Sequence, residues 1–303
     1  MDGDRGRMAS ARHELPFGAE LVGDRVRFRL WAPRASAVSL LLEGADRGEL
    51  AMQAEPGGWF SLTTDRAGAG TRYRYVVDGM AVPDPASRFQ PDGVHGASEV
   101  IDPNAYRWQD TGWPGRAWEE FVIYELHLGT FSPSGDFAGA VGRLDYLRQL
   151  GITAVELMPI GEFAGCRNWG YDGVQFYAPA SCYGRPEDLK ALVDACHARG
   201  LAVLLDVVYN HFGPRVITCP PSRPISLLSG ITRPGARRSI MTGRAAVRCA
   251  TSSFRTRFIG SRNFGSTGCG STPFTPLPTT APLTSSSNWL KQFAAGSPTA
   301  RST

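Results

Sequence analysis

Three polar residues follow an apolar run in the stretch Gly200–Pro214, GLAVLLDVVYNHFGP. The run Leu201–Leu205 is short and rich in Val and Leu, which predicts a strand buried on both faces. Asp206, Asn210 and His211 come next, and such groups are costly to bury unless they serve a site. Barrels of alternating strands and helices carry their chemistry at this end of their strands. We therefore interpret these three residues as candidates for a binding or catalytic site.

A second candidate is the stretch NWGYD that begins at Asn168. Trp169 and Tyr171 offer aromatic faces on which a sugar ring can pack, and Asp172 and His211 can hydrogen bond to its hydroxyls. The alternative is a packed loop whose polar tips are satisfied internally. The residues alone leave both interpretations open.

Other polar residues are interpreted as structural. His127 follows an apolar strand, and we favour a packed loop residue there. Glu125 and Glu156 sit near strand ends, where they are expected to join ion pairs or hydrogen bonds. The cysteines have neither metal-binding nor disulfide spacing, which is typical of reduced, inert thiols in a cytoplasm. Those in the patterned part of the chain are Cys166, Cys182 and Cys196.

Strands and helices alternate in the part of the chain that carries these residues. This order predicts a parallel sheet with right-handed crossovers, as in a β/α barrel. Three strands are fewer than the eight that close such a barrel, so the barrel is expected to be incomplete. The expected strands are Phe121–Leu126, Ile152–Met158 and Leu201–Val208, and the expected helices are Phe137–Leu150 and Pro186–Arg199.

The stretch before the barrel carries only strand signals. Val26, Phe28 and Leu30 alternate with arginines, and Asp78-Gly79 is typical of a hairpin turn. Short strands at this spacing predict a β-sandwich. The expected domains are a disordered leader at 1–14, the β-sandwich at 15–103, a linker at 104–118, the first part of the barrel at 119–214 and an aberrant basic tail at 215–303.

The basic tail is defined by its charge. Residues 215–303 hold 12 of the 32 basic residues and none of the 28 acidic ones. A tail that binds nucleic acid is one interpretation. It should show interleaved aromatic residues or helical charge stripes, and this tail shows neither. We therefore favour the alternative that the tail was never selected as protein.

Several motifs resemble a known family. The stretch DVVYNH from Asp206 is similar to the first signature region of the α-amylase superfamily, glycoside hydrolase family 13. The segment MPI from Met158 and the segment NWGYD resemble the regions before it. Residues 15–214 more closely resemble the malto-oligosyltrehalose trehalohydrolases. The matching segments are FGAE from Phe17, LWAP from Leu30, VPDPASRFQP from Val82, VHG from Val94, IYELH from Ile123 and GTF from Gly129.

This resemblance implies a fold and a set of roles. The fold is an immunoglobulin-like β-sandwich of the E-set type followed by an incomplete (β/α)8 TIM barrel. Tyr171 would stack on the sugar in the cleavage subsite, His211 would bind its hydroxyls, and Asp206 and Asn210 would shape the site from behind. The family uses a retaining mechanism with an Asp nucleophile and a Glu acid. Both lie in later motifs that are missing here, so we expect no catalytic residues and no catalysis in this chain.

A shift of reading frame accounts for the missing motifs. Moved back by one base, the codons of Asn263–Pro276 (NFGSTGCGSTPFTP) permit EFRFDGLRLDAVHA, which resembles the family motif with its nucleophile. The codons of Ile231–Gly243 permit HHTPWGAAINYDG, those of Val216–Pro220 permit GNYLP, and those of Trp289–Ala294 permit LAEAVR. The first three strings resemble family segments, the fourth is helical, and all share one frame in the family's order. We therefore expect a frameshift at about Pro214.

The resemblance implies a glycoside hydrolase that releases trehalose from maltooligosyltrehalose by cleaving the α-1,4 bond next to the terminal trehalose unit. The alternatives are a glycogen branching or debranching enzyme of the same superfamily, and a non-catalytic glucan-binding remnant. The expected partner is maltooligosyltrehalose or another α-glucan, with no cofactor, no metal, no nucleic acid and no membrane. No signal peptide is visible, so the expected location is cytoplasmic.

Overall fold

The computed structural model describes residues 17–44, 48–109 and 112–208, and these all belong to one compact unit. The expected leader at 1–14 and basic tail at 215–303 lie outside the described residues. Asn210 and His211 also lie outside them. The described residues comprise the sandwich and the strands and helices up to Val208.

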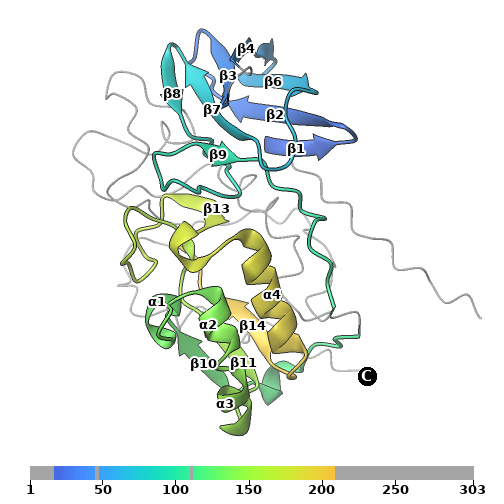
Figure 1. Ribbon diagram of the computed structural model, residues 1–303, viewed down its shortest axis with the longest axis vertical. Coiled ribbons are helices and arrows are strands. Elements are labelled where there is room, and N and C mark those ends of the chain that lie inside the picture. The colour runs from blue at the N-terminus through green and yellow to red at the C-terminus, as the bar shows by residue number, and fades with distance from the viewer. Residues whose placement is uncertain (1–16, 45–47, 110–111, 209–303) are drawn as a thin grey trace, which may run out of the picture. The chain divides into compact units, whose positions relative to one another are not determined.

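The N-terminal strands form two antiparallel sheets, which confirms the predicted β-sandwich (Figure 1). The first sheet has the order β1-β2-β6-β5, and the second has the order β4-β3-β7-β8, with β9 paired to β7. The first sheet consists of β1 Gly18–Val22, β2 Arg25–Trp31, β6 Trp59–Thr64 and β5 Gln53–Glu55. The second consists of β4 Glu49–Ala51, β3 Val38–Leu42, β7 Arg72–Val77, β8 Met80–Val82 and β9 Ser98–Glu99.

The alternation of side chains builds the sandwich core. Val26, Phe28 and Leu30 are almost fully buried, as their spacing of two predicts. The rings of Phe28 and Tyr73, from opposite sheets, meet with centroids 4.8 Å apart. The predicted hairpin is also present, because β7 pairs with β8 around Asp78 and Gly79, both with positive φ.

The second part of the chain forms a parallel sheet in the order β10-β11-β14. Its strands are β10 Ile123–Leu126, β11 Ala154–Leu157 and β14 Ala202–Leu205. Neighbouring strands run parallel and their connections carry helices, so this sheet is the incomplete barrel that the alternation predicts. The connecting helices are α1 Leu128–Phe131, α2 Phe137–Val141, α3 Leu144–Gln149 and α4 Pro186–His197, with short 3-10 helices at Trp118–Glu120 and Ser181–Tyr183.

The structure differs from the prediction in several places, including element ends that shift by one to three residues. The helix expected over Phe137–Leu150 is divided at Gly142, since glycine weakens a helix interior and ends α2 here. The last strand stops at Leu205 instead of Val208. An antiparallel hairpin of β12 Gly161–Glu162 and β13 Gln175–Pro179 was not expected. β12 has only two residues, and the sequence QFYAP of β13 shows no alternation of apolar and polar residues.

Helices α2, α3 and α4 cover one face of the parallel sheet (Figure 1). Their apolar side chains pack with those of β11 and β14 into a second core. This core includes Phe137, Leu144, Leu147, Val155, Leu157, Leu192, Val193 and Val203. It holds the strands so that their carboxyl ends lie together.

Contacts join the end of the sandwich to β13 and α4. Arg185 binds the carboxylate of Glu99 at 2.6 Å, and its guanidinium lies over the ring of Phe89. Lys190 Nζ donates to the carbonyl of Pro103 at 2.9 Å. Arg185 directly precedes α4 and Lys190 lies within it, so the sandwich helps to support this helix of the barrel segment.

Candidate functional site

The candidate site lies at the carboxyl ends of the three parallel strands. Asp206 directly follows β14, and its backbone N–H donates to the carbonyl of Leu157 in β11 at 2.9 Å. Glu125 in β10 is paired in register with Glu156 in β11, which is paired with Leu204. Side chains two residues apart share a face, so Asp206, Glu156 and Glu125 lie on the face away from the helices.

Tyr171 and Asp206 are joined by a hydrogen bond. The Tyr171 hydroxyl donates to Asp206 Oδ2 at 2.9 Å. Burial of the hydroxyl raises the pKa of Tyr171 to about 12, and the bond to Asp206 and the negative charges nearby add to this effect. The phenol therefore stays protonated at neutral pH and keeps donating to the carboxylate. This bond ties the candidate loop to the end of the last strand.

The floor of the site is acidic. Burial raises the pKa of Glu156, and the charges of Glu125 and Asp206 raise it further. The charged neighbours that act on Glu156 in the described part of the chain are thus carboxylates. A site of this character suits neutral, hydroxyl-rich or positively charged ligands better than anions.

A glycine fixes the loop that carries the aromatic residues. Gly170 has φ of +97°, and a Cβ atom there would lie 1.9 Å from the carbonyl oxygen of Pro159. The side chain of Asn168 accepts a hydrogen bond from the Gly170 N–H at 2.7 Å. Trp169 and Tyr171 are thus held on either side of a tight turn.

His127 supports this loop from the end of β10. Its Nε2 lies 2.6 Å from the carbonyl oxygen of Asn168 and 3.1 Å from the hydroxyl of Tyr183. Its ring meets the Trp169 ring edge-on, with centroids 4.9 Å apart. These contacts match the packed role favoured from the sequence. Tyr183 was missed, since a tyrosine just before a helix carries no signal of its own.

The structure brings together only some of the predicted site residues. Tyr171 contacts Asp206, whereas Trp169 contacts His127 and is 61% exposed. Asp172 is exposed and makes no hydrogen bond within the described ranges. The predicted partners Asn210 and His211 lie beyond the described residues. Exposed aromatic rings beside a carboxylate at strand ends can bind a sugar through its apolar face and its hydroxyls.

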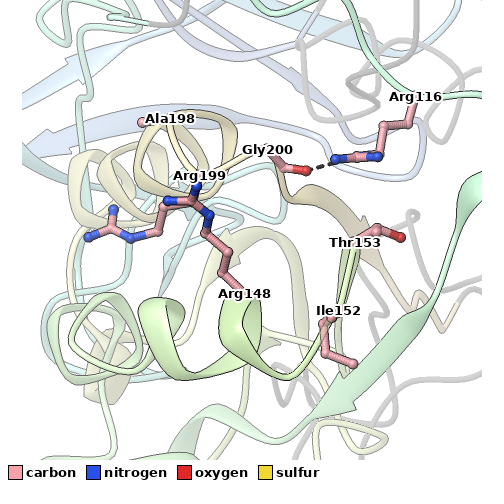
Figure 2. A pocket seen from close by; sticks show the side chains of 8 residues that line it. Arg116, Arg148, Ile152, Thr153, Ala198, Arg199 and Gly200 are labelled. Atoms are coloured by element: carbon pink, nitrogen blue, oxygen red, sulfur yellow. Dashed lines mark hydrogen bonds between the residues drawn. The ribbon is translucent and has the colours of Figure 1, made fainter.

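A groove of about 490 Å³ lies at the opposite end of the sheet (Figure 2). Arg116 donates to the carbonyl of Gly200 at 2.9 Å across one side of it. Ile152 and Thr153 in its wall come just before β11, so the groove lies at the amino ends of the strands. It is therefore separate from the candidate site. Its lining residues are Arg116, Arg148, Gly151, Ile152, Thr153, Ala198, Arg199 and Gly200.

The described ranges contain neither a metal-binding cluster nor a membrane-spanning helix. They contain no group of three or more His, Cys, Asp or Glu residues that could hold a metal ion. None of the helices in the described ranges is long and apolar enough to cross a membrane.

Two family models match the chain. Residues 16–105 match carbohydrate-binding module 48, the isoamylase N-terminal domain. Residues 88–219 match the alpha amylase catalytic domain. These matches fall on the β-sandwich and on the incomplete barrel.

Curated relatives agree with both matches. The chain is 50% identical over 200 residues to the malto-oligosyltrehalose trehalohydrolase of Deinococcus radiodurans, covering 66% of this chain and 32% of the relative. It is 48% identical over 201 residues to that of Saccharolobus solfataricus, covering 66% of this chain and 35% of the relative. The chain thus spans about a third of the length of these relatives.

A solved structure shares the fold. The pullulanase of Paenibacillus barengoltzii, in complex with maltohexaose and α-cyclodextrin, is similar with a TM-score of 0.57 and 30% identity. The similarity covers 65% of this chain and 38% of the pullulanase.

Proposed function

This chain belongs to the malto-oligosyltrehalose trehalohydrolase family of the α-amylase superfamily, and we propose that its gene derives from one for a hydrolase that releases trehalose from maltooligosyltrehalose. The bond to be cleaved is the α-1,4 bond next to the terminal trehalose unit. The proposed mechanism retains the anomeric configuration, with an Asp nucleophile and a Glu acid. The cytoplasmic location and the domain limits remain predictions from the sequence.

One structural observation supports this proposal. The hydrogen bond between Tyr171 and Asp206 holds an aromatic ring at the carboxyl end of the barrel strands, where barrel enzymes bind substrate. Tyr171 is 39% exposed, so its ring is available to a ligand. Because Asp206 accepts the phenolic hydrogen, the hydroxyl end of the ring is held beside the end of β14. A fixed aromatic face suits the stacking of a glucose ring.

We assign the remaining roles on this basis. Trp169 extends the aromatic surface next to Tyr171, and Asp172 hydrogen bonds to sugar hydroxyls from the same loop. Asp206 positions Tyr171 and shapes the site. From the family resemblance, we propose that His211 binds sugar hydroxyls and that Asn210 shapes the site. The proposed ligand is an α-glucan, in keeping with the maltohexaose bound by the structurally similar pullulanase.

We further propose that the 303-residue chain does not catalyse this reaction. Residues 215–303 contain no Asp and no Glu, so they supply neither a nucleophile nor an acid. The codons of Asn263–Pro276 permit the family motif in the other frame, which favours a frameshift at about Pro214. A frameshift alone would then explain why both catalytic residues are missing.

DNA sequencing across codons 205–225 tests the frameshift. A missing or additional base relative to an intact gene supports it, and an uninterrupted frame that encodes the printed residues contradicts it. A frame-restored chain should then release trehalose from maltooligosyltrehalose, while the printed chain should release none above background. Formation of α-1,6 branches by the restored chain would instead indicate a branching enzyme.

A second function is favoured by the match to carbohydrate-binding module 48. The sandwich at 16–105 has its own buried core and its own pair of sheets, so it can bind a glucan without the barrel. Pull-down of this fragment on insoluble starch or glycogen tests this function. Retention on the polysaccharide supports a glucan-binding remnant. A fragment that stays in the supernatant contradicts this second function and favours the interpretation as an inactive hydrolase.

A further inference from the structure

His127 links the aromatic loop of the candidate site to the core of the barrel segment. It lies between β10 and α1, and its backbone carbonyl accepts from the N–H groups of Thr130 and Phe131 at 3.1 and 3.0 Å. The first turn of α1 therefore fixes the backbone from which the imidazole extends. Both nitrogen atoms of the imidazole then have partners.

Tyr183 holds the imidazole from the side of the core. Its side chain is buried, and its ring centroid lies 5.9 Å from that of Phe163 and 6.2 Å from that of Phe137, in edge-to-face arrangements. Its hydroxyl oxygen lies 3.1 Å from His127 Nε2. Because all three aromatic residues belong to the second core, the packing of that core fixes the position of the imidazole.

The contact with Asn168 shows which imidazole nitrogen carries a hydrogen. His127 Nε2 lies 2.6 Å from the backbone carbonyl oxygen of Asn168, and a carbonyl oxygen can only accept. Nε2 is therefore the donor. Nδ1 lies 3.2 Å from the hydroxyl oxygen of Thr130, which can donate to a neutral imidazole or accept from a protonated one. The geometry thus requires a hydrogen on Nε2 in both charge states of the ring.

Trp169 lies between two backbone groups that are both held. The Asn168 carbonyl before it accepts from His127, and the Gly170 N–H after it donates to the Asn168 side chain at 2.7 Å. The Trp169 ring also meets the His127 ring, with centroids 4.9 Å apart and an interplanar angle of 61°. Trp169 is nevertheless largely exposed, so its ring is oriented while its surface stays open to a ligand.

We propose that His127 is a positioning residue of the glucan site, because its Nε2 hydrogen bond to Asn168 holds the Trp169 ring in the orientation that receives a glucose ring. An aromatic side chain that is already oriented loses less conformational entropy on binding, which strengthens the affinity. The role in glucan binding rests on the proposed function, whereas the hydrogen bond to Asn168 does not.

Two amide variants separate positioning from packing. The amide nitrogen of glutamine is as many bonds from Cβ as Nε2 of histidine, whereas the amide nitrogen of asparagine corresponds to Nδ1. We expect His127→Gln to bind maltohexaose almost as tightly as the unaltered chain. We expect His127→Asn to raise the dissociation constant about fivefold, as for the loss of one hydrogen bond. Equal dissociation constants for the two variants would overturn the proposal.

Tryptophan fluorescence of the full chain measures this binding. The part of the quenching by maltohexaose that disappears in Trp169→Phe reports on this site. Urea unfolding of the same variants measures stability. If His127 only stabilised the fold, the affinity and the free energy of unfolding would fall together. We expect instead that His127→Gln and His127→Asn agree in the free energy of unfolding and differ in affinity.

Gly129 offers a change that removes no hydrogen-bonding group. A Cβ atom there would lie 2.9 Å from Cε1 of His127 and 3.4 Å from a ring carbon of Tyr183. Gly129→Ala should therefore displace the imidazole and raise the dissociation constant by about two- to fivefold. The matched control is Gly68→Ala in the sandwich, where a Cβ atom meets no atom of the described residues within 4 Å. Unchanged affinity in both variants would contradict the proposal.

The hydrogen on Nε2 can also be observed directly. Nuclear magnetic resonance of the chain with isotope-labelled histidine distinguishes a hydrogen on Nε2 from one on Nδ1. His127→Gln identifies the signal of His127 among the five histidines. We expect Nε2 to carry the hydrogen, and a neutral imidazole with its hydrogen on Nδ1 would overturn the proposal.

Together these measurements distinguish the positioning role from the proposed function. If the unaltered chain does not respond to maltohexaose, the proposed function fails, while a hydrogen on Nε2 still supports the bond to Asn168. If the chain binds maltohexaose and the two amide variants bind it equally, the glucan site stands and the positioning role of His127 fails.

Discussion

The sandwich and the barrel segment differ in how their sheets end. In the sandwich, two antiparallel sheets face each other and enclose a core of residues from both. In the barrel segment, helices cover one face, and within the described ranges β10 and β14 each pair with β11 alone. Exposed apolar side chains lie near these ends, at Val122, Ile123 and Val207. The same chain thus contains one self-sufficient domain and one that needs more strands.

The largest effect is expected when the two regions are separated. A fragment of residues 15–105 should be monomeric and unfold cooperatively on heating, because its own two sheets supply most of its core, to which the barrel segment adds Val174. A fragment of residues 106–208 should aggregate, since open strand edges and apolar faces pair with other copies. Circular dichroism melting and light scattering measure both. A soluble, cooperative barrel fragment would contradict the comparison.

The next effect concerns the sandwich core. Phe28→Ala removes a ring that is fully buried against Tyr73, and we expect the free energy of unfolding of the 15–105 fragment to fall by about 3–5 kcal/mol. Urea denaturation measures this change. Val22→Ala is the control, since Val22 is 44% exposed and its loss should cost less than about 0.5 kcal/mol. Similar losses in both variants would argue against a tightly packed core.

A buried carboxyl makes the sandwich sensitive to pH. Burial raises the pKa of Asp84 from 3.8 to about 6, although Tyr73 donates a hydrogen bond to it. The protonated form is therefore favoured by folding, so this contribution is present below about pH 4 and is lost as the pH rises through 6. We expect the sandwich to lose up to about 3 kcal/mol of unfolding free energy between pH 4 and pH 7 through this group.

Two variants isolate the contribution of Asp84. Asp84→Asn should reduce the dependence of the unfolding free energy on pH, even if it also changes the unfolding free energy at every pH. Asp24→Asn alters an exposed carboxyl in the turn between β1 and β2 and should leave the dependence nearly unchanged. Unfolding curves recorded across this pH range compare them. An identical dependence in all three proteins would rule out Asp84 as its source.

The smallest effect is expected at the polar end of the barrel segment. Tyr171→Phe keeps the aromatic face but removes the hydrogen bond to Asp206, which we expect to lower kcat/KM of a frame-restored chain by about fivefold, or about 1 kcal/mol. Hydrolysis of maltooligosyltrehalose measures the change. Tyr146→Phe on the exposed side of α3 is the matched control and should have no effect. Equal activity of both variants would show that the hydrogen bond between Tyr171 and Asp206 does not contribute to the proposed site.

Local patterns were sufficient for much of the fold. The spacing of Val26, Phe28 and Leu30 predicted the buried face of β2, and Pro186 and Gly200 bracketed α4 within a few residues. The signals failed where contacts between distant segments decide the structure. The hairpin of β12 and β13 is one example, because each of its strands is defined by pairing with the other.

The sequence by itself determined the two regions, the three parallel strands of the barrel segment, and the residues Trp169, Tyr171 and Asp206 as candidates, since backbone periods and residue chemistry are local properties. Only the tertiary structure decided which candidates meet. Tyr171 and Asp206 are 35 residues apart, and their hydrogen bond depends on a loop turned at Gly170 and a strand set in register beside β11. Distances of this kind are set by the packing of whole elements, which no spacing along the chain records.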